Sequence, residues 1–129
     1  MSWPAAIGAV AIGGALGSVV RYLVSTWFLE KFGAGFPWGT FTINVSGAFV
    51  IGVVLELAAT RPGFSPYLRL LLATGFLGGY TTFSTFAYET YVLSADTFSV
   101  LSVVYAGGSV VAGLFATLAG VGLVRAFLP

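Results

Sequence analysis

The segment with the clearest chemical potential is a run of glycines, hydroxyl side chains and phenyl rings at residues 75–86, GFLGGYTTFSTF. Phe83 and Phe86 are three residues apart, so on a helix they share one face, and Ser84 and Thr85 stand between them in the sequence. The edge of a phenyl ring is electropositive, and a hydroxyl group donates hydrogen bonds. Together these groups could bind a small anion that has lost its water. The alternative is that the two rings pack in the core or face lipid.

Further polar side chains stand in otherwise apolar stretches. Asn44 either joins two helices or presents its amide donors to an anion. Tyr105 and Ser109 are four residues apart and share a helix face. Tyr105 lies too deep for the aromatic belt at a membrane surface, which favours a lining role. Arg21 and Glu89 lie several residues inside apolar stretches. Arg21 either concentrates anions in a water-filled vestibule or snorkels to the headgroups, and the role of Glu89 is open.

The composition places these side chains in lipid. Of the 129 residues, 58% are apolar and 7% are charged, whereas a soluble domain carries roughly 25% charged residues. A soluble monomer is therefore excluded. The sequence has no His and no Cys, which excludes disulfides, thiolate nucleophiles, zinc clusters and Ser-His triads. No nucleophile with a partner is visible, so we expect no enzyme. A net charge of +1 without a basic run argues against nucleic acid as a partner.

Four stretches are long enough to cross a bilayer, which takes ~20 apolar residues in a helix. We expect a single domain, 1–129, with four transmembrane helices near 4–29, 37–59, 67–93 and 98–127. The continuous apolar runs argue against a β-barrel. The connections are too short to hold another domain. The chain is therefore predicted to be an all-α, multi-pass membrane protein that acts inside the bilayer, with no soluble protein partner implied.

The third of these helices is expected to be interrupted. Adjacent glycines and a run of Thr and Ser are poor helix formers, which predicts a break at Gly78–Thr82. Non-helical backbone is tolerated at this depth only where it is buried in protein or lines a cavity. The free carbonyls of such a break could bind a cation, and half-helix N-termini attract an anion. The alternative is an unbroken helix whose hydroxyls bond back to carbonyls four residues earlier.

The charges barely fix the orientation of the chain in the membrane. The side that holds both termini would carry Arg61, Arg69 and Arg125. The other side would carry Lys31, and Arg21 lies within the first helix toward that same end. So weak a bias permits insertion both ways round and antiparallel pairing, whereas the alternative is a fixed cytoplasmic N-terminus. Because four short helices make a poor pore alone, any cavity is expected at a subunit interface.

Taken together, these segments resemble the Fluc (CrcB) family of fluoride channels over the whole chain. The matching residues are Gly13-Gly14-Ala15-Leu16-Gly17 with Arg21-Tyr22, Trp38-Gly39-Thr40 with Asn44 and Gly47, the string at 75–86, and Tyr105 with Ser109. The string GFLGG-x-TTFSTF is highly specific. The resemblance implies an antiparallel, dual-topology homodimer of four-helix subunits, with two fluoride pores, in a prokaryotic inner membrane.

The resemblance also implies roles for individual residues. Phe83 and Phe86 would be the pore phenylalanines. The polar pore track would consist of Asn44, Ser84, Thr85, Tyr105 and Ser109. Arg21 would be the vestibule arginine. Some members carry a further hydroxyl one turn beyond the end of this track, where the present chain has Gly113, so the far end of the track differs.

The resemblance further implies a central Na⁺ ion. The backbone carbonyls of Gly78 and Thr81, one pair from each subunit, would hold it at the break. The ion would lie at the centre of the homodimer, as a structural cofactor.

Passive conduction of fluoride is the function that these features favour. Neutral hydroxyls, one amide and ring edges bind an anion weakly enough to release it, and no lysine lies mid-membrane to trap it. The strongest rival is a small multidrug exporter, which depends on a glutamate in the first helix, where this chain has none before Glu30. A second rival is a non-transporting membrane subunit, whose polar residues would pair off between helices.

Overall fold

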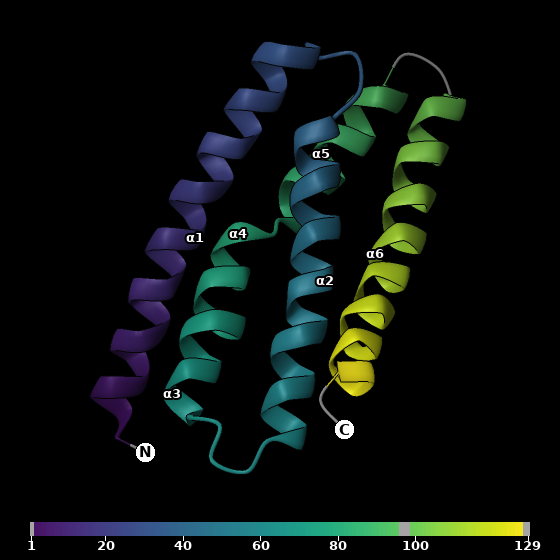
Figure 1. The fold of residues 1–129 in the computed structure, drawn as a ribbon. Helices are drawn as coiled ribbons and strands as arrows, with labels where there is room; N and C mark the ends of the chain where they lie inside the picture. Colours follow the sequence, from purple (N-terminus) through teal and green to yellow (C-terminus); the bar gives the residue numbers. More distant parts are fainter. Residues whose placement is uncertain (1, 96–98, 128–129) are drawn as a thin grey trace.

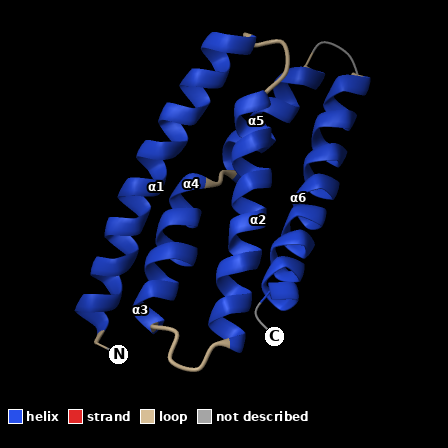
Figure 2. Cartoon of the chain, viewed as in Figure 1, coloured by secondary structure: helices blue, strands red, loops and turns tan. Residues whose placement is uncertain are grey.

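The computed structural model describes residues 2–95 and 99–127, and it is built from helices joined by short connections (Figures 1 and 2). The three long helices are α1 (Trp3–Phe32), α2 (Trp38–Thr60) and α6 (Val100–Phe127). Each is long and apolar enough to cross a membrane. Helices α1 and α2 occupy the ranges 4–29 and 37–59, where the sequence predicts helices. For the helix predicted at 98–127, the structure has a helix that begins at Val100, after the non-helical Ser99, and residue 98 lies outside the described residues.

The region expected to form the third helix is a succession of shorter elements. These are α3 (Pro66–Arg69), the π-helix η1 (Leu70–Leu77), α4 (Gly78–Tyr80) and α5 (Phe83–Ser94). In Figure 1, α3 and α4 lie along one line beside α1, and α5 continues toward the opposite end after a lateral step. The described residues contain no strand, in agreement with the predicted all-α fold.

The predicted interruption is present but narrower than expected. Thr81, with ψ 157°, and Thr82, with φ −149°, are extended, whereas Gly78–Tyr80 remain helical. Glycine is a poor helix former on its own, yet tertiary packing overrides that preference here. A Cβ atom at Gly79 would run into the Gly14 carbonyl of α1, so the absence of a side chain lets the two helices approach closely. Gly79 therefore serves close packing, whereas a Cβ atom at Gly78 would meet open space, and the two threonines form the break.

Asn44 on α2 holds the break together. Its Oδ1 accepts a hydrogen bond from the Thr82 N–H at 2.8 Å, and its Nδ2 donates to the Thr82 carbonyl at 3.0 Å. One side chain thus satisfies both backbone groups of a residue that has left the helix. The Thr82 hydroxyl in turn caps α5 by accepting from the Thr85 N–H at 3.3 Å. The Thr81 hydroxyl donates to the Leu77 carbonyl at 2.8 Å.

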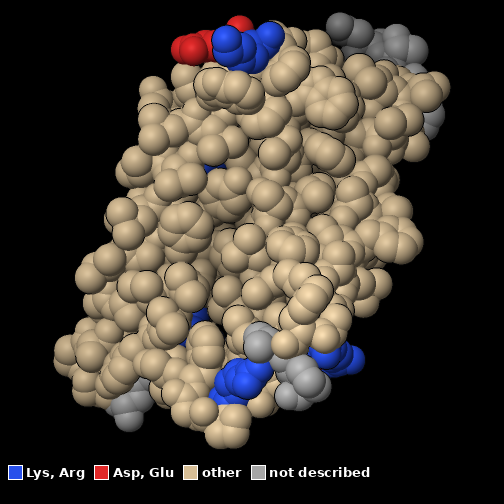
Figure 3. All heavy atoms as spheres, in the orientation of Figure 1, with Lys and Arg blue, Asp and Glu red and all other residues tan. Residues whose placement is uncertain are grey.

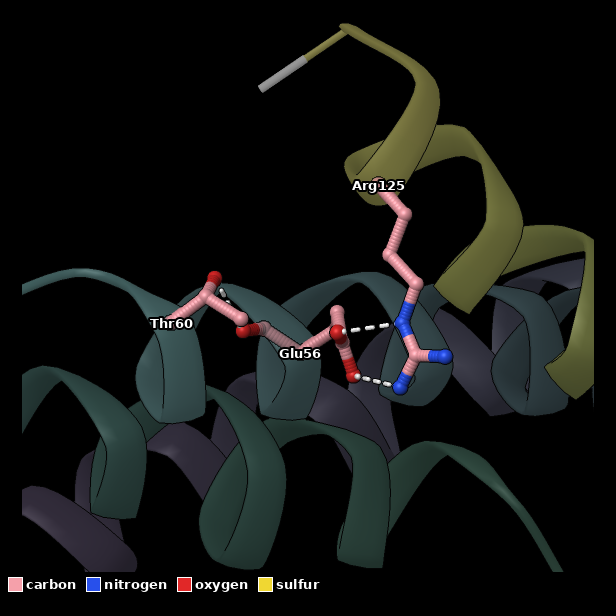
Figure 4. Close-up of polar contacts among 3 residues, drawn as sticks. All are labelled: Glu56, Thr60 and Arg125. Atoms are coloured by element: carbon pink, nitrogen blue, oxygen red, sulfur yellow. Dashed lines mark hydrogen bonds and ion pairs between the residues drawn. The ribbon is translucent and has the colours of Figure 1, made fainter. Parts of the chain in front are cut away.

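Charged side chains gather at the two ends of the helices. Figure 3 shows the middle of the visible face almost free of Lys, Arg, Asp and Glu. At the end that holds both chain termini, Arg125 Nε donates to Glu56 Oε1 at 2.7 Å and ties α6 to α2 (Figure 4). The Thr60 hydroxyl donates to the Glu56 carbonyl. Because Arg125 is largely exposed, water screens this ion pair, which fixes the helix ends more than it stabilises the fold.

The contact between α1 and the η1–α4 segment gives the first testable prediction. A Cβ atom at Gly17 would meet the backbone of Phe76, which cannot move without shifting η1. We expect Gly17→Ala to cost about 1–3 kcal/mol of unfolding free energy, the usual effect of overpacking, and to lower the thermal midpoint in detergent. The matched control is Gly8→Ala on the same helix, where a Cβ atom meets open space. Equal midpoints for the two variants would contradict this packing.

The bridge from α2 to the break gives the second prediction. The carboxylate of Asn44→Asp cannot donate a hydrogen bond, so it leaves the Thr82 carbonyl unpaired and facing a negative charge. We expect a loss of about 1–3 kcal/mol in thermal unfolding of the purified protein. Ser46→Ala is the control on the same helix, since it removes a hydroxyl that contacts Tyr80 Oη and the Ile43 carbonyl but makes no bond to the break. A midpoint for Asn44→Asp no lower than that of Ser46→Ala would show that the bridge is dispensable.

Candidate functional site

The two phenylalanines begin α5 directly after the break. Their ring centroids are 5.9 Å apart with an interplanar angle of 50°, so the rings lie side by side as their spacing predicts. Phe83 is 79% exposed on the single chain, whereas Phe86 is half-buried. On its inner side, Phe86 packs against Tyr105, and the centroids of these two rings are 5.2 Å apart. A row of aromatic rings therefore runs from the surface of α5 toward α6.

The hydroxyls of the same turn form a small cluster at the break. Thr82 Oγ1 donates to Thr85 Oγ1 at 3.0 Å and lies 3.5 Å from Ser84 Oγ. Because Thr82 is the donor, the Thr85 hydroxyl does not use its own proton in this pair. Ser84 is exposed and Thr85 is half-buried. The structure thus leaves hydroxyl protons of this turn able to face a ligand.

Asn44 joins α2 to the break, which is one of the two roles that the sequence left open for its amide. Both of its bonds go to Thr82, one as donor and one as acceptor. An amide nitrogen carries two hydrogens, and the Thr82 carbonyl takes only one of them. Joining α2 to the break therefore leaves one Nδ2–H of Asn44 for a further acceptor.

Tyr105 and Ser109, predicted to share a face of α6, differ in their surroundings. Tyr105 is fully buried, with the Phe36 ring centroid 5.4 Å away on one side and Phe86 on the other. Its hydroxyl donates to Glu89 Oε2 at 2.6 Å. The Ser109 Oγ atom is buried and has no hydrogen-bond partner within residues 2–95 and 99–127. A buried hydroxyl without a partner is costly, so it marks a position that suits a bound acceptor.

Glu89 and Thr40 are residues of this site that the sequence did not connect with it. Thr40 Oγ1 donates to Glu89 Oε1 at 2.8 Å, so the carboxylate accepts from both α2 and α6. The side chains of Thr40 and Glu89 line a cavity of about 350 Å³ between the end of α1, the start of α2 and α5. The position of Glu89 several residues inside an apolar stretch was a sequence signal that this residue has a role in the site. Its partners, however, are set by the packing of helices far apart in the sequence.

Arg21 lies inside α1 and is half-buried. Its Nε atom is buried without a hydrogen-bond partner in the described part of the chain. No hydrogen bond joins Arg21 to the predicted polar track there. A guanidinium nitrogen in this state can attract an anion, and the vestibule role of Arg21 stays a prediction.

The carbonyls of Gly78 and Thr81 have lost their usual helical partners. The Thr82 N–H, four residues after Gly78, bonds to Asn44 instead. The Thr85 N–H, four residues after Thr81, bonds to the Thr82 hydroxyl. Both residues line a cavity of about 320 Å³ beside α2. Oxygen atoms of this kind suit a hard cation. The described residues contain no cluster of acidic, His or Cys side chains that could hold a metal ion.

Comparison with known proteins identifies the family. The family model described as "CrcB-like protein, Camphor Resistance (CrcB)" matches residues 8–121. A Rhizobium etli protein named "Fluoride-specific ion channel FluC" is 49% identical over 117 residues, which cover 91% of this chain and 94% of the relative. Proteins of the same name from Chloroflexus aurantiacus and Leptospira interrogans are 46% identical over 119 residues and 45% identical over 118 residues. These matches cover 92% of this chain and 94% and 93% of the relatives.

The names of these relatives are those of an ion channel and not of an enzyme. Together with three helices that can each cross a bilayer, they identify a multi-pass membrane protein. The family match covers the break, the two phenylalanines and the polar residues of α2 and α6, so it confirms the resemblance drawn from these motifs. The chain belongs to the CrcB family.

Proposed function

We propose that this chain is a passive, fluoride-selective channel that exports cytoplasmic fluoride across the inner membrane. The observation that carries the proposal is the row formed by Phe83, Phe86 and Tyr105, which starts at the break and has uncharged hydrogen-bond donors beside it. Relatives at 44–49% identity are named fluoride-specific ion channels, which supports the same ion. HF crosses lipid from acid surroundings and dissociates in neutral cytoplasm, so export runs down the fluoride gradient.

The chemistry of the row suits an anion that is small and strongly hydrated. Fluoride must exchange its water for donors at close range, and each donor must be weak enough to let it leave. The candidates are the second amide hydrogen of Asn44, the proton of Thr85 and the unpartnered hydroxyl of Ser109. Ser84 and Tyr105 complete the proposed track. Ring edges of Phe83 and Phe86 add positive potential without a full charge.

The functional unit in this proposal is an antiparallel, dual-topology homodimer. Residues 66–94 would cross as a fourth, broken span, which brings both termini to one side. In the single chain, Phe83, Ser84 and Gly78 at the break are exposed. Interrupted backbone is stable in a membrane only when protein or a water-filled cavity covers it. A second copy in the opposite orientation supplies that cover and leaves the fluoride paths at the interface.

A central sodium ion fits the same arrangement. The Gly78 and Thr81 carbonyls lack their helical donors and border one cavity, and a partner copy brings a second pair. When bound, the ion supplies positive charge that offsets the dipoles of these carbonyls at the point where two broken helices meet. On this chain, Asn44 performs the related task of keeping Thr82 extended, so that the carbonyls stay free of the helix ladder.

Arg21 is proposed to act at a vestibule, outside the uncharged part of the path. Its unpaired Nε would raise the local concentration of anions before they lose water. Selectivity is then set farther in, where hydroxyl and amide donors replace the hydration shell. The ion thus meets a charged side chain first and only neutral donors farther in. It is attracted into the path but is not bound too tightly to leave.

The direct test is ion efflux from liposomes that contain the purified protein, with fluoride and chloride measured side by side. We expect fluoride to leave while chloride stays inside. Proton flux driven by a cationic drug would favour the multidrug exporter. If neither fluoride nor drug moves, the chain is a non-transporting subunit, and the proposal fails.

The role of the rings is tested by substitution. Phe86→Ile and Phe83→Ile keep apolar bulk but remove the ring quadrupole, worth about 0.5–1.5 kcal/mol. We expect each to slow fluoride efflux by about two- to tenfold while the protein stays folded and dimeric. Phe115→Ile, at an exposed position of α6, is the matched control and should retain its rate. Undiminished efflux in the α5 variants would mean that these rings only pack.

A further inference from the structure

An apolar groove runs along the first turns of α1, at the end of the molecule that holds both chain termini. Its apolar lining consists of Trp3, Ala6, Ile7, Val10, Ala11 and Leu70. The α1 members recur every three to four residues and so follow one face of the helix, while Leu70, the first residue of η1, lines the other side. The groove has a volume of about 600 Å³.

The groove has the direction and length of a lipid acyl chain. From Trp3 to Ala11 the helix rises about 12 Å, most of the ~15 Å that one leaflet contributes to the hydrocarbon core. Trp3 and Ile7 are 81% and 63% exposed, so the groove opens sideways from α1 toward the surrounding lipid. A chain lying along α1 would therefore reach from the membrane surface nearly to the midplane.

A hydroxyl group stands at the outer end of this groove. The backbone N–H of Ser2, which also lines the groove, donates to Tyr67 Oη of α3 at 3.1 Å. Because this hydroxyl accepts, its own proton stays available for another acceptor. Trp and Tyr are enriched at the level of the lipid headgroups, and Trp3 and Tyr67 both belong to this end. The outer end of the groove therefore lies where lipid phosphate groups are found.

The same end of the molecule carries excess positive charge. Glu56 and Arg125 pair with each other, whereas Arg61 and Arg69 are exposed and form no ion pair within residues 2–95 and 99–127. On the face shown in Figure 3, this end displays atoms of Lys and Arg but none of Asp or Glu. Arg69 directly precedes Leu70 of the groove and belongs to the same short helix as the tyrosine. A cation and a hydroxyl donor thus stand beside the mouth of an apolar groove.

We propose that this groove is a binding site for an anionic phospholipid, with one acyl chain along α1 and the phosphate group on Arg69 and Tyr67. A guanidinium group donates two parallel hydrogen bonds to phosphate oxygens, and the tyrosine proton adds a third. A zwitterionic lipid fits less well, because its own cationic group meets the excess positive charge of this end. The site lies on α1, α3 and the start of η1, so the inference does not depend on which ion the chain conducts.

The phosphate contact is tested by native mass spectrometry of the purified protein in detergent. Phosphatidylglycerol with two oleoyl chains is added, and phosphatidylcholine with the same chains is run in parallel. We expect one phosphatidylglycerol to be retained per chain and phosphatidylcholine to be retained about fivefold more weakly. Arg69→Gln removes the charge and should weaken the retention of phosphatidylglycerol by about fivefold. Lys31→Gln, at an exposed position near the other end of α1, is the matched control and should leave it unchanged.

The acyl-chain contact is tested by filling the groove. Ala11→Phe places a ring at its inner end, and because Ala11 is exposed the fold accommodates the larger side chain. We expect the retention of phosphatidylglycerol to fall to the level of phosphatidylcholine. Ala5→Phe, at an exposed position outside the groove on the same helix, is the control and should retain the lipid. Glycerol 3-phosphate, which has no acyl chains, should leave the thermal midpoint unchanged, whereas phosphatidylglycerol should raise it.

Three results would overturn the inference. Equal retention of the two lipids by the unmodified protein would show an unselective lipid layer. A thermal midpoint raised by glycerol 3-phosphate as much as by phosphatidylglycerol would show a site for free phosphate in which the groove takes no part. If Ala11→Phe converts a dimer to a monomer in size-exclusion chromatography, a second copy of the chain covers the groove and no lipid site exists there.

Discussion

The fold depends on how one pair of backbone groups is satisfied inside a membrane. Lipid offers no hydrogen bonds, so an extended residue in mid-span needs protein partners for its N–H and its carbonyl. Asn44 provides both to Thr82, at 2.8 and 3.0 Å. The bridge lies at the lateral step between α4 and α5, directly before the Phe83–Phe86 pair, and it takes the N–H that would bond to the Gly78 carbonyl. The Thr82 hydroxyl takes the Thr85 N–H, which frees the Thr81 carbonyl.

The polar groups of the chain divide into those that hold the fold and those that remain for a ligand. The bonds of Thr81 to Leu77 and of Ser102 to Thr90 satisfy backbone carbonyls and stabilise the helices. In contrast, the Ser109 hydroxyl and the Arg21 Nε are buried without partners in the described part of the chain. Unsatisfied polar atoms cost free energy, and a protein that retains them has a use for an acceptor there.

Much of this architecture could be predicted from the sequence, because spans and weak helix formers are local features. Length and hydropathy predicted the helices at 4–29 and 37–59, and the GGYTTFSTF pattern predicted an interruption. The pattern could not predict that Gly78–Tyr80 stay helical, because close packing on α1 decides it. The capture of Tyr105 and Thr40 by Glu89 was also invisible, since it joins residues of three different helices. Long-range pairs of this kind depend on how the helices pack.

The claim at the centre of this account is that an uncharged path lined by hydroxyls and rings passes fluoride and rejects other halides. The most direct measurement is the reversal potential in a planar bilayer with fluoride on one side and chloride on the other. The account predicts a current carried by fluoride alone, with a reversal potential displaced far toward the fluoride equilibrium value. A reversal potential near zero, with chloride carrying comparable current, would contradict it.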